Sequence, residues 1–234
     1  MPARARRIAD GPAGRDEAVR VLAAGGIVAV PTDTVYGIAV ALATPGGIER
    51  LFAAKSRPPD KAIALLLADV EQASDIGVLS GSATRLARAF WPGGLTLVVE
   101  RRTDRPMPAA LTGGELAPGA IPTVGLRVPA HDAPRALARA LGPLPTTSAN
   151  RSGEPELRDA EAIEAELGAA LDLILDGGPS IGGPASTVVD CTGAQVTILR
   201  AGAIPAAAIE AAIAAERPVQ AIDGVADHPV DVGR

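Results

Sequence analysis

Positive charge gathers in one short segment of this sequence at a spacing that suits an anionic ligand. The segment KSRPPDK places Lys55, Arg57 and Lys61 within seven residues, and this density of cations matches the charge of a polyphosphate. Lys55 and Lys61 are the only lysines in the chain, and lysine supplies a compact ammonium for a phosphate or a carboxylate. A solvated helix end, where cations oppose the helix dipole, would account for the same residues.

Hydroxyl groups gather in three further loops. TTSAN, at 146–150, carries three hydroxyls and an amide that could orient neutral and anionic oxygens. PTDTVYG, at 31–37, carries two threonines and a tyrosine, although a turn whose Thr and Asp side chains bond their own backbone would use the same residues. GGPSIGGPAST, at 177–187, is rich in glycine but lacks the lysine of a P-loop. We interpret it either as an irregular connection or as a loop that closes on substrate.

Other kinds of catalytic site find little support in the sequence. No Ser-His-Asp, Cys-His or paired-carboxylate set stands out, which disfavours a hydrolase. The single cysteine, Cys191, excludes an internal disulfide, and with only His131 and His228 no cluster of soft metal ligands can form. We expect Cys191 to be a small buried residue at a strand end and not a nucleophile. The sequence therefore predicts no metal centre.

Short helices alternate with short β-branched strands along the chain, a pattern typical of an α/β fold. A helix from about 15 to 24 should end at the pair Gly25 and Gly26 and lead into a strand at 27–30, directly before PTDTVYG. Further helices are expected at about 47–54, 83–90, 133–141, 160–167 and 206–215, and further strands at about 63–67, 95–100, 124–128, 173–175, 186–190 and 196–199, with one entering TTSAN. Because ligand sites of open α/β sheets lie where loops leave strand ends, these strands would position the polar loops.

The chain length of 234 residues and a hydrophobic content of 47% indicate one globular domain with a full core. We expect a flexible N-terminal tail over 1–14, the domain over 15–215 and a C-terminal tail over 216–234. Within the domain, 101–122 consists mostly of Pro, Gly, Thr and charged residues. It should form a surface excursion and could act as a lid.

Charge and hydropathy limit the partners and the location of the protein. A formal net charge of −5 argues against a protein that mainly coats nucleic acid. The apolar stretch at 21–30 is broken by glycines and stopped by Pro31, and it is far short of the roughly 20 residues that span a bilayer. No membrane helix is therefore expected. The N-terminal segment has no apolar signal core, and the cytoplasm is the expected compartment.

A series of motifs in a fixed order resembles the YrdC-like threonylcarbamoyl-AMP synthase family. They are PTDTVYG, KSRP, WPGGLTLVV, VGLRVPAH, TTSANRSG and STVVD followed by ILRAGAI, and the resemblance runs from about 15 to 215. The family's hallmark of KxR followed by SxN falls on Lys55, Arg57, Ser148 and Asn150. The resemblance implies a single α/β domain (α+β in some schemes), with a twisted mixed sheet of parallel and antiparallel strands flanked by helices around a large concave basic cavity.

The resemblance also implies an activity, that of an L-threonylcarbamoyladenylate synthase, which is a nucleotidyltransferase. Such an enzyme condenses L-threonine, bicarbonate and ATP, with Mg²⁺ on the triphosphate, to threonylcarbamoyl-AMP and pyrophosphate, for the modified adenosine at position 37 of tRNA. Its product would pass to the tRNA threonylcarbamoyl-transfer machinery, and the family leaves a contact with tRNA or double-stranded RNA open. By position, the resemblance assigns threonine binding to Thr34, Arg127, Thr146 and Ser186, ATP binding to Arg57, Lys61, Thr123, Ser148 and Arg200, and catalysis to Lys55, Arg57, Ser148 and Asn150.

Charge decides what the cationic residues would do in such a reaction. We expect Lys55 and Arg57 to stabilise carboxylate and phosphate charge, and Arg127 to pair with the threonine carboxylate, bidentately if the geometry allows. The chain also departs from the family pattern. Leu66 lies nearest to a position that often carries a histidine, PTDT stands where PTET is more usual, and no acidic residue precedes Ser186.

The chain resembles the short form of the family, without the second C-terminal domain of the long form, and two alternative functions remain. One is a YrdC-like RNA-binding or ribosome-assembly protein, against which the acidic net charge and the scarcity of aromatic residues count. The other is a carbamoyl-transfer paralogue that uses the same cavity, which usually belongs to a longer chain.

Overall fold

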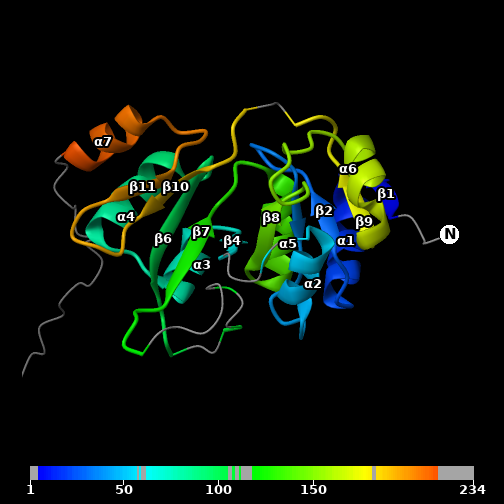
Figure 1. The fold of residues 1–234 in the computed structure, drawn as a ribbon, viewed down its shortest axis with the longest axis horizontal. Helices are drawn as coiled ribbons and strands as arrows, with labels where there is room; N and C mark the ends of the chain where they lie inside the picture. Colours follow the sequence, from blue (N-terminus) through cyan, green and yellow to red (C-terminus); the bar gives the residue numbers. More distant parts are fainter. Residues whose placement is uncertain are drawn as a thin grey trace, which may run out of the picture.

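A computed structural model describes residues 5–56, 58, 62–104, 107–108, 111, 118–180 and 183–215. Figure 1 shows a mixed sheet that runs through the whole molecule, with helices packed against it. This arrangement confirms the predicted α/β class.

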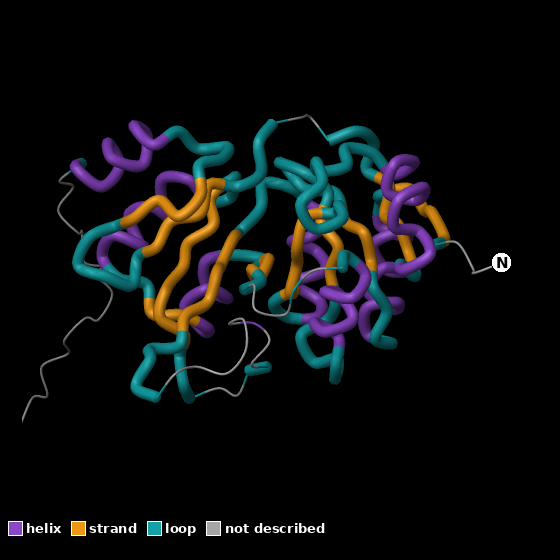
Figure 2. Tube along the Cα trace, in the orientation of Figure 1, coloured by secondary structure: helices purple, strands orange, loops and turns teal. Residues whose placement is uncertain are grey.

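The sheet combines parallel and antiparallel pairs. Its strands are β1 (Arg6–Ala9), β2 (Val28–Val30), β3 (Gly37–Ala39), β4 (Ala64–Leu66), β5 (Gly77–Val78), β6 (Leu95–Arg101), β7 (Thr123–Arg127), β8 (Leu144–Ser148), β9 (Leu173–Asp176), β10 (Thr187–Asp190) and β11 (Thr197–Arg200). They lie in the order β1-β9-β2-β3-β8-β4-β7-β6-β10-β11, with β5 paired to β6. β9 is parallel to both β1 and β2, and β4–β7 and β6–β10 are also parallel, whereas the remaining pairs are antiparallel. Figure 2 shows the strands in orange with helices in purple around them.

Helices cover both faces of the sheet around β2 and β3. The helices are α1 (Pro12–Ala23), α2 (Gly47–Ala54), α3 (Val70–Ile76), α4 (Gly81–Phe90), α5 (Asp132–Leu141), α6 (Ala160–Leu167) and α7 (Ala206–Ala214), with a 3₁₀ turn at Gly168–Ala170. Val28 and Val30 pack in one apolar cluster with residues of α1 and α5, such as Leu22. Ala29 packs in the other cluster with residues of β3 and α2, such as Ile38. Burial on both faces explains why β2 reads as a continuous apolar run.

The N-terminal segment differs from the sequence prediction. A flexible tail was predicted over 1–14, but Arg6–Ala9 form β1, in which Ile8 lies opposite Leu175 of β9. α1 then begins at Pro12 and not near 15, because proline suits the first turn of a helix, where its missing N–H costs nothing. The tail prediction must be corrected for these residues. β1 was missed because it is an edge strand with mostly exposed side chains, which leaves no apolar alternation to find.

The end of α1 follows the local prediction. Gly25 has a positive φ of 88°, its N–H donates to the Leu22 carbonyl at 2.9 Å, and the Gly26 N–H donates to the Val21 carbonyl at 2.9 Å. This pair of bonds is a Schellman motif, in which glycine takes the left-handed position without a side-chain clash. It delivers the chain into β2 at the predicted place.

Most other predicted elements are confirmed, and three short ones were missed. α2 and α6 have the predicted bounds, and the predicted strands from 63–67 onwards correspond to β4, β6, β7, β8, β9, β10 and β11. β3, α3 and β5 were not predicted. α3 is short and begins with a side-chain cap, in which Asp69 accepts the Gln72 N–H at 3.0 Å. Among the described residues, no helix is both long and apolar enough to cross a bilayer.

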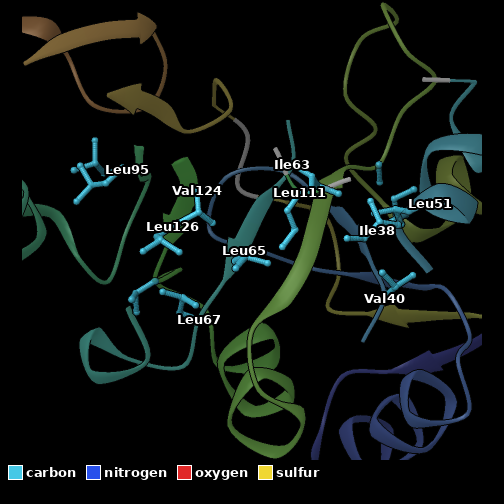
Figure 3. Packing of buried hydrophobic residues seen from close by; sticks show 14 of the residues in the cluster. Ile38, Val40, Leu51, Ile63, Leu65, Leu67, Leu95, Leu111, Val124 and Leu126 are labelled. Atoms are coloured by element: carbon cyan, nitrogen blue, oxygen red, sulfur yellow. The ribbon is translucent and has the colours of Figure 1, made fainter. Parts of the chain in front are cut away.

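The segment predicted as a surface excursion and lid, 101–122, is described only in part. Residues 105–106, 109–110 and 112–117 lie outside the described residues, as does the predicted C-terminal tail at 216–234. Within the described part, β6 continues to Arg101, and Leu111 is buried beside Ile63, as Figure 3 shows. The Ile63 N–H donates to the Leu111 carbonyl at 3.3 Å.

Candidate functional site

A cavity of about 250 Å³ opens over the middle of the sheet. The strands β3, β4, β6, β7, β8, β10 and β11 all contribute to its lining, together with the loop before β3. Its polar lining residues are Thr32, Thr34, Tyr36, Thr96, Thr123, Arg127, Thr146, Thr147, Ser148, Ser186 and Arg200. Within the described part of the chain, none of the lining residues is acidic.

This cavity collects most of the site residues that the sequence singled out. The residues assigned to threonine and those described among the ATP set line the same cavity: Thr34, Thr123, Arg127, Thr146, Ser148, Ser186 and Arg200. Lys55 and Asn150 lie behind the lining. Arg57 and Lys61 lie outside the described residues.

Arg127, at the end of β7, is held by acceptors on three sides. Its Nε donates to the Gly93 carbonyl at 3.0 Å, its Nη1 to Thr34 Oγ1 at 3.0 Å and its Nη2 to Asp33 Oδ1 at 2.7 Å. Burial lowers the pKa of Arg127, and the Asp33 carboxylate opposes this shift. A guanidinium nevertheless stays protonated in proteins and carries five N–H donors. Three of these donate to acceptors among the described residues, which leaves one N–H on each Nη.

The PTDTVYG loop turns out to be both a side-chain-stabilised turn and part of the site. Thr32 Oγ1 donates to the Val35 carbonyl at 2.6 Å and accepts the Thr34 N–H at 3.2 Å, which is the turn interpretation. The Thr34 hydroxyl instead faces Arg127. The turn therefore presents Thr34 to the cavity.

Tyr36 connects this loop by hydrogen bonds to the glycine-rich segment after β9. Its hydroxyl donates to the Gly178 carbonyl at 2.7 Å and accepts the Gly177 N–H at 3.0 Å. Burial is the main cause that raises the pKa of Tyr36, so the phenol stays protonated and can make both bonds. The residue links two loops that both border the site.

The Lys55 side chain is buried at the centre of a hydrogen-bond network and does not lie at a solvated helix end. It caps the C-terminus of α2, its side chain is 1% exposed, and its Nζ donates to Ser148 Oγ at 3.2 Å and to Asn150 Oδ1 at 3.0 Å. The Ser148 carbonyl and Thr147 Oγ1 also accept from Nζ. Lys55 therefore reaches the cavity through Ser148, which does line it.

Further bonds stabilise this network. Ser148 Oγ donates to Asn150 Oδ1 within TTSAN at 2.6 Å, and the N–H of Ser152, two residues after TTSAN, donates to the Lys55 carbonyl at 3.0 Å. Ser56, directly after Lys55, has a φ of 52°, a left-handed conformation that non-glycine residues rarely adopt and that the surroundings must stabilise. These contacts bring together Lys55, Ser148 and Asn150, three of the four residues of the KxR and SxN hallmark.

Ser186 links the cavity to strands on either side of it. Thr96 Oγ1 lies 2.8 Å from Ser186 Oγ. Arg200 donates from Nη2 to the same hydroxyl at 3.1 Å and to the Ser186 carbonyl at 2.8 Å. Burial lowers the pKa of Arg200, and Glu156 opposes this shift. Thr96 was missed by the sequence analysis, although a hydroxyl inside the apolar strand LTLVV was a usable signal.

Leu66, at the position where the family often has a histidine, contributes an apolar side chain to the lining of the cavity. It lies opposite Arg127 in the β4–β7 ladder.

Two other sequence predictions concern cysteine and metals. Cys191 is buried directly after β10, and burial raises the pKa of its thiol to about 11. The prediction of a buried cysteine at a strand end is confirmed. In the described ranges, no group of three or more His, Cys, Asp or Glu side chains could hold a metal ion.

Comparison with known proteins gives consistent matches. The Sua5/YciO/YrdC family model, described as telomere recombination, matches residues 20–202. The threonylcarbamoyl-AMP synthase of Bacillus subtilis is 34% identical over 91% of this chain and 59% of that protein. The crystal structure of Pyrococcus abyssi Sua5 complexed with L-threonine is 31% identical and superposes with a TM-score of 0.80 over 91% of this chain and 61% of that one.

A third match extends the likeness in fold. The crystal structure of E. coli YciO is 26% identical and superposes with a TM-score of 0.73 over 86% of this chain and 96% of that one. The chain thus spans less than two thirds of the length of the Bacillus subtilis and Pyrococcus abyssi proteins but nearly all of YciO.

Proposed function

The chain belongs to the Sua5/YciO/YrdC family, and on that premise we propose that it is an L-threonylcarbamoyladenylate synthase. It condenses L-threonine, bicarbonate and ATP to threonylcarbamoyl-AMP and pyrophosphate. The observation that carries the proposal is that a single cavity is lined by the residues assigned to threonine and by described residues assigned to ATP.

The chemistry places three anionic reactants side by side. The neutral amine of threonine attacks carbon dioxide derived from bicarbonate, forms a C–N bond and loses a proton, which gives an N-carboxylate. An oxygen of this carboxylate then attacks the α-phosphorus of ATP, and the bond to the β-phosphate oxygen breaks to release pyrophosphate. Such a reaction depends on positioning and on offsetting the charge of the reactants. Two buried or half-buried cations in the lining, Arg127 and Arg200, supply that charge.

Arg127 binds the carboxylate of threonine in this proposal. One N–H remains on each Nη after the three bonds within the protein, so two donors on one rigid group can meet two carboxylate oxygens. Thr34, Thr146 and Ser186 place hydroxyls around the same space.

Among the residues assigned to ATP, Thr123, Ser148 and Arg200 line the cavity. The family assignment adds Arg57 and Lys61, which lie outside the described residues. Lys55 acts behind the lining by holding Ser148 and Asn150 in place. The described lining offers hydroxyls and guanidinium groups and no carboxylate, which fits phosphate oxygens better than a bare cation. Mg²⁺ would therefore be held by the triphosphate and water and would neutralise phosphate charge.

The wider role follows from the product. We propose that threonylcarbamoyl-AMP serves the modification of adenosine 37 in tRNA and passes to the threonylcarbamoyl-transfer machinery in the cytoplasm. A contact with tRNA or double-stranded RNA belongs to the same proposal.

The test is pyrophosphate release by the purified protein with ATP and Mg²⁺, with and without threonine and bicarbonate, combined with mass spectrometry of the product. Release that needs both co-substrates and yields threonylcarbamoyl-AMP supports the synthase. Salt-sensitive RNA binding without threonine-dependent turnover would instead favour an RNA-binding protein, and turnover that needs carbamoyl phosphate would favour a carbamoyl-transfer paralogue.

Arg127→Ala tests the threonine side of the site. Loss of the guanidinium should raise the KM for threonine by at least about tenfold and leave the KM for ATP within about twofold of the wild-type value. The reason is that only threonine loses its charged partner. Equal effects on both KM values would contradict the assignment.

A further inference from the structure

Asp33 forms an ion pair with Arg127 at the border of the cavity. Asp33 Oδ1 accepts from Arg127 Nη2 at 2.7 Å, and the side chains are 15% and 7% exposed. Asp33 itself is not one of the lining residues, and its bond to Arg127 Nη2 is its link to the cavity. Resting on the proposed function, we propose that Asp33 is a positioning residue for the amino-acid substrate, which holds the guanidinium with its two remaining N–H groups toward the cavity.

The need for such a residue follows from the other two acceptors. The Gly93 carbonyl and Thr34 Oγ1 are neutral, so Asp33 makes the one charged bond of the three. Hydrogen bonds between ionised groups are stronger and more strictly oriented than neutral ones. A largely buried guanidinium without its counter-charge is also costly, and turning toward water lowers that cost. Without Asp33, Arg127 would no longer keep one orientation in the empty site.

Charge and orientation predict opposite effects on threonine binding. A carboxylate next to Arg127 weakens the attraction of that arginine for the substrate carboxylate, so removing the charge alone should strengthen threonine binding. Removing the acceptor should weaken binding, because the guanidinium must be ordered again each time a substrate binds. The sign of the change therefore separates the two roles.

Two variants exploit this difference. Asp33→Asn keeps an oxygen acceptor and removes the charge, whereas Asp33→Ala removes both. We expect Asp33→Ala to raise the KM for threonine by about tenfold with the KM for ATP within about twofold. Asp33→Asn should leave the KM for threonine at or below the wild-type value. An Asp33→Ala protein with an unchanged or lower KM for threonine, or an Asp33→Asn protein as impaired as Asp33→Ala, overturns the proposal.

A second ion pair supplies a matched control. Asp10 accepts from Arg15 at 2.7 Å and 2.9 Å, its side chain is 12% exposed, and neither residue lines the cavity. Asp10→Ala should lower the melting temperature while the KM for threonine stays at the wild-type value. If Asp10→Ala raised the KM for threonine as much as Asp33→Ala does, the increase in both variants would come from general destabilisation. That result would overturn the proposal.

A spectroscopic readout separates this proposal from the proposed function. The NMR signal of Arg127 Nε–H, assigned by its loss in Arg127→Lys, should be sharp in the wild type and in Asp33→Asn, and shifted or broadened in Asp33→Ala. A wild-type protein without synthase activity would refute the proposed function, while this signal would still report on Asp33. An identical signal in Asp33→Ala overturns the positioning role whether or not the protein makes the adenylate.

Discussion

Replacing Lys55 by methionine is the most direct test of the network behind the cavity. Lys55→Met keeps an unbranched side chain and removes the ammonium that donates to Ser148 Oγ at 3.2 Å and to Asn150 Oδ1 at 3.0 Å. The side chain is 1% exposed, so water cannot take the place of the ammonium without a rearrangement of the loops. We expect Ser148 to lose its fixed orientation and the buried acceptors to lose their donor.

The expected loss of stability can be bounded from these contacts. A hydrogen bond to a charged group contributes about 1.5–3 kcal/mol, but bonds that share one ammonium are not additive, and the buried charge itself costs free energy. The acceptors of the Lys55 ammonium named above are neutral, so its removal leaves buried acceptors without a donor, which costs about 1–3 kcal/mol. Because methionine retains the apolar packing of the lysine stem, we expect a loss of about 2 kcal/mol. In a domain of this size, such a loss lowers the melting temperature by about 4–8 °C.

Urea unfolding and thermal melting measure this loss, and Arg151→Met is the control. Arg151 is likewise a cation that donates to another side chain, the Glu166 carboxylate, but its own side chain is 52% exposed, so its removal should cost less than about 1 kcal/mol. In turnover, the KM for ATP should rise in Lys55→Met, because Ser148 lines the cavity, and stay at the wild-type value in Arg151→Met. If Lys55→Met proved as stable as Arg151→Met and kept the KM for ATP, the reasoning about the network would be refuted.

Three further predictions follow from other contacts. Thr96→Val removes the hydroxyl that lies 2.8 Å from Ser186 Oγ and should raise the KM for threonine by about fivefold, whereas an unchanged value in steady-state kinetics would leave Thr96 without a part in the site. Cys191, whose thiol pKa is raised to about 11 by burial, should react with iodoacetamide at pH 8 only after unfolding; rapid labelling of the folded protein, followed by mass spectrometry, would contradict this. The bond from Arg15 lowers the pKa of Asp10 below 3.8 in the folded state, so the pair stabilises the protein above that pH and stops doing so as the pH falls through the lower folded value. Asp10→Asn should therefore lose less stability than the wild type between neutral and acid pH in urea titrations, and identical losses would contradict the ion-pair contribution.

Local chemistry explains why so many elements could be predicted from the sequence. The glycine pair after α1 supplies the left-handed residue that ends the helix. α6 begins where Asp159 accepts the Ala162 N–H at 2.8 Å, a cap that can be read from the residues alone. Elements without such signals were missed, among them β1, whose exposed edge carries no apolar pattern.

The residues that line the cavity could be predicted because the family motifs name them. Polar residues at or after the ends of neighbouring strands converge when the strands lie side by side, and Thr34, Arg127 and Thr146 line one cavity. Thr96 was missed because the motifs assign it no role and it lies within an apolar run, and only the pairing of β6 with β10 places it against Ser186.

The sequence by itself determined the α/β class and most of the elements, because each depends on signals within a few neighbouring residues, and the resemblance of its motifs to a family indicated the polar residues that line the cavity. Only the tertiary structure decided which of those residues bond to one another. Asp33 and Arg127 are separated by 94 positions, and Lys55 and Ser148 by 93. Nothing in the local sequence indicates that Lys55 is buried behind the cavity or that Arg127 already carries a carboxylate partner, because both facts depend on the order in which the strands lie in the sheet.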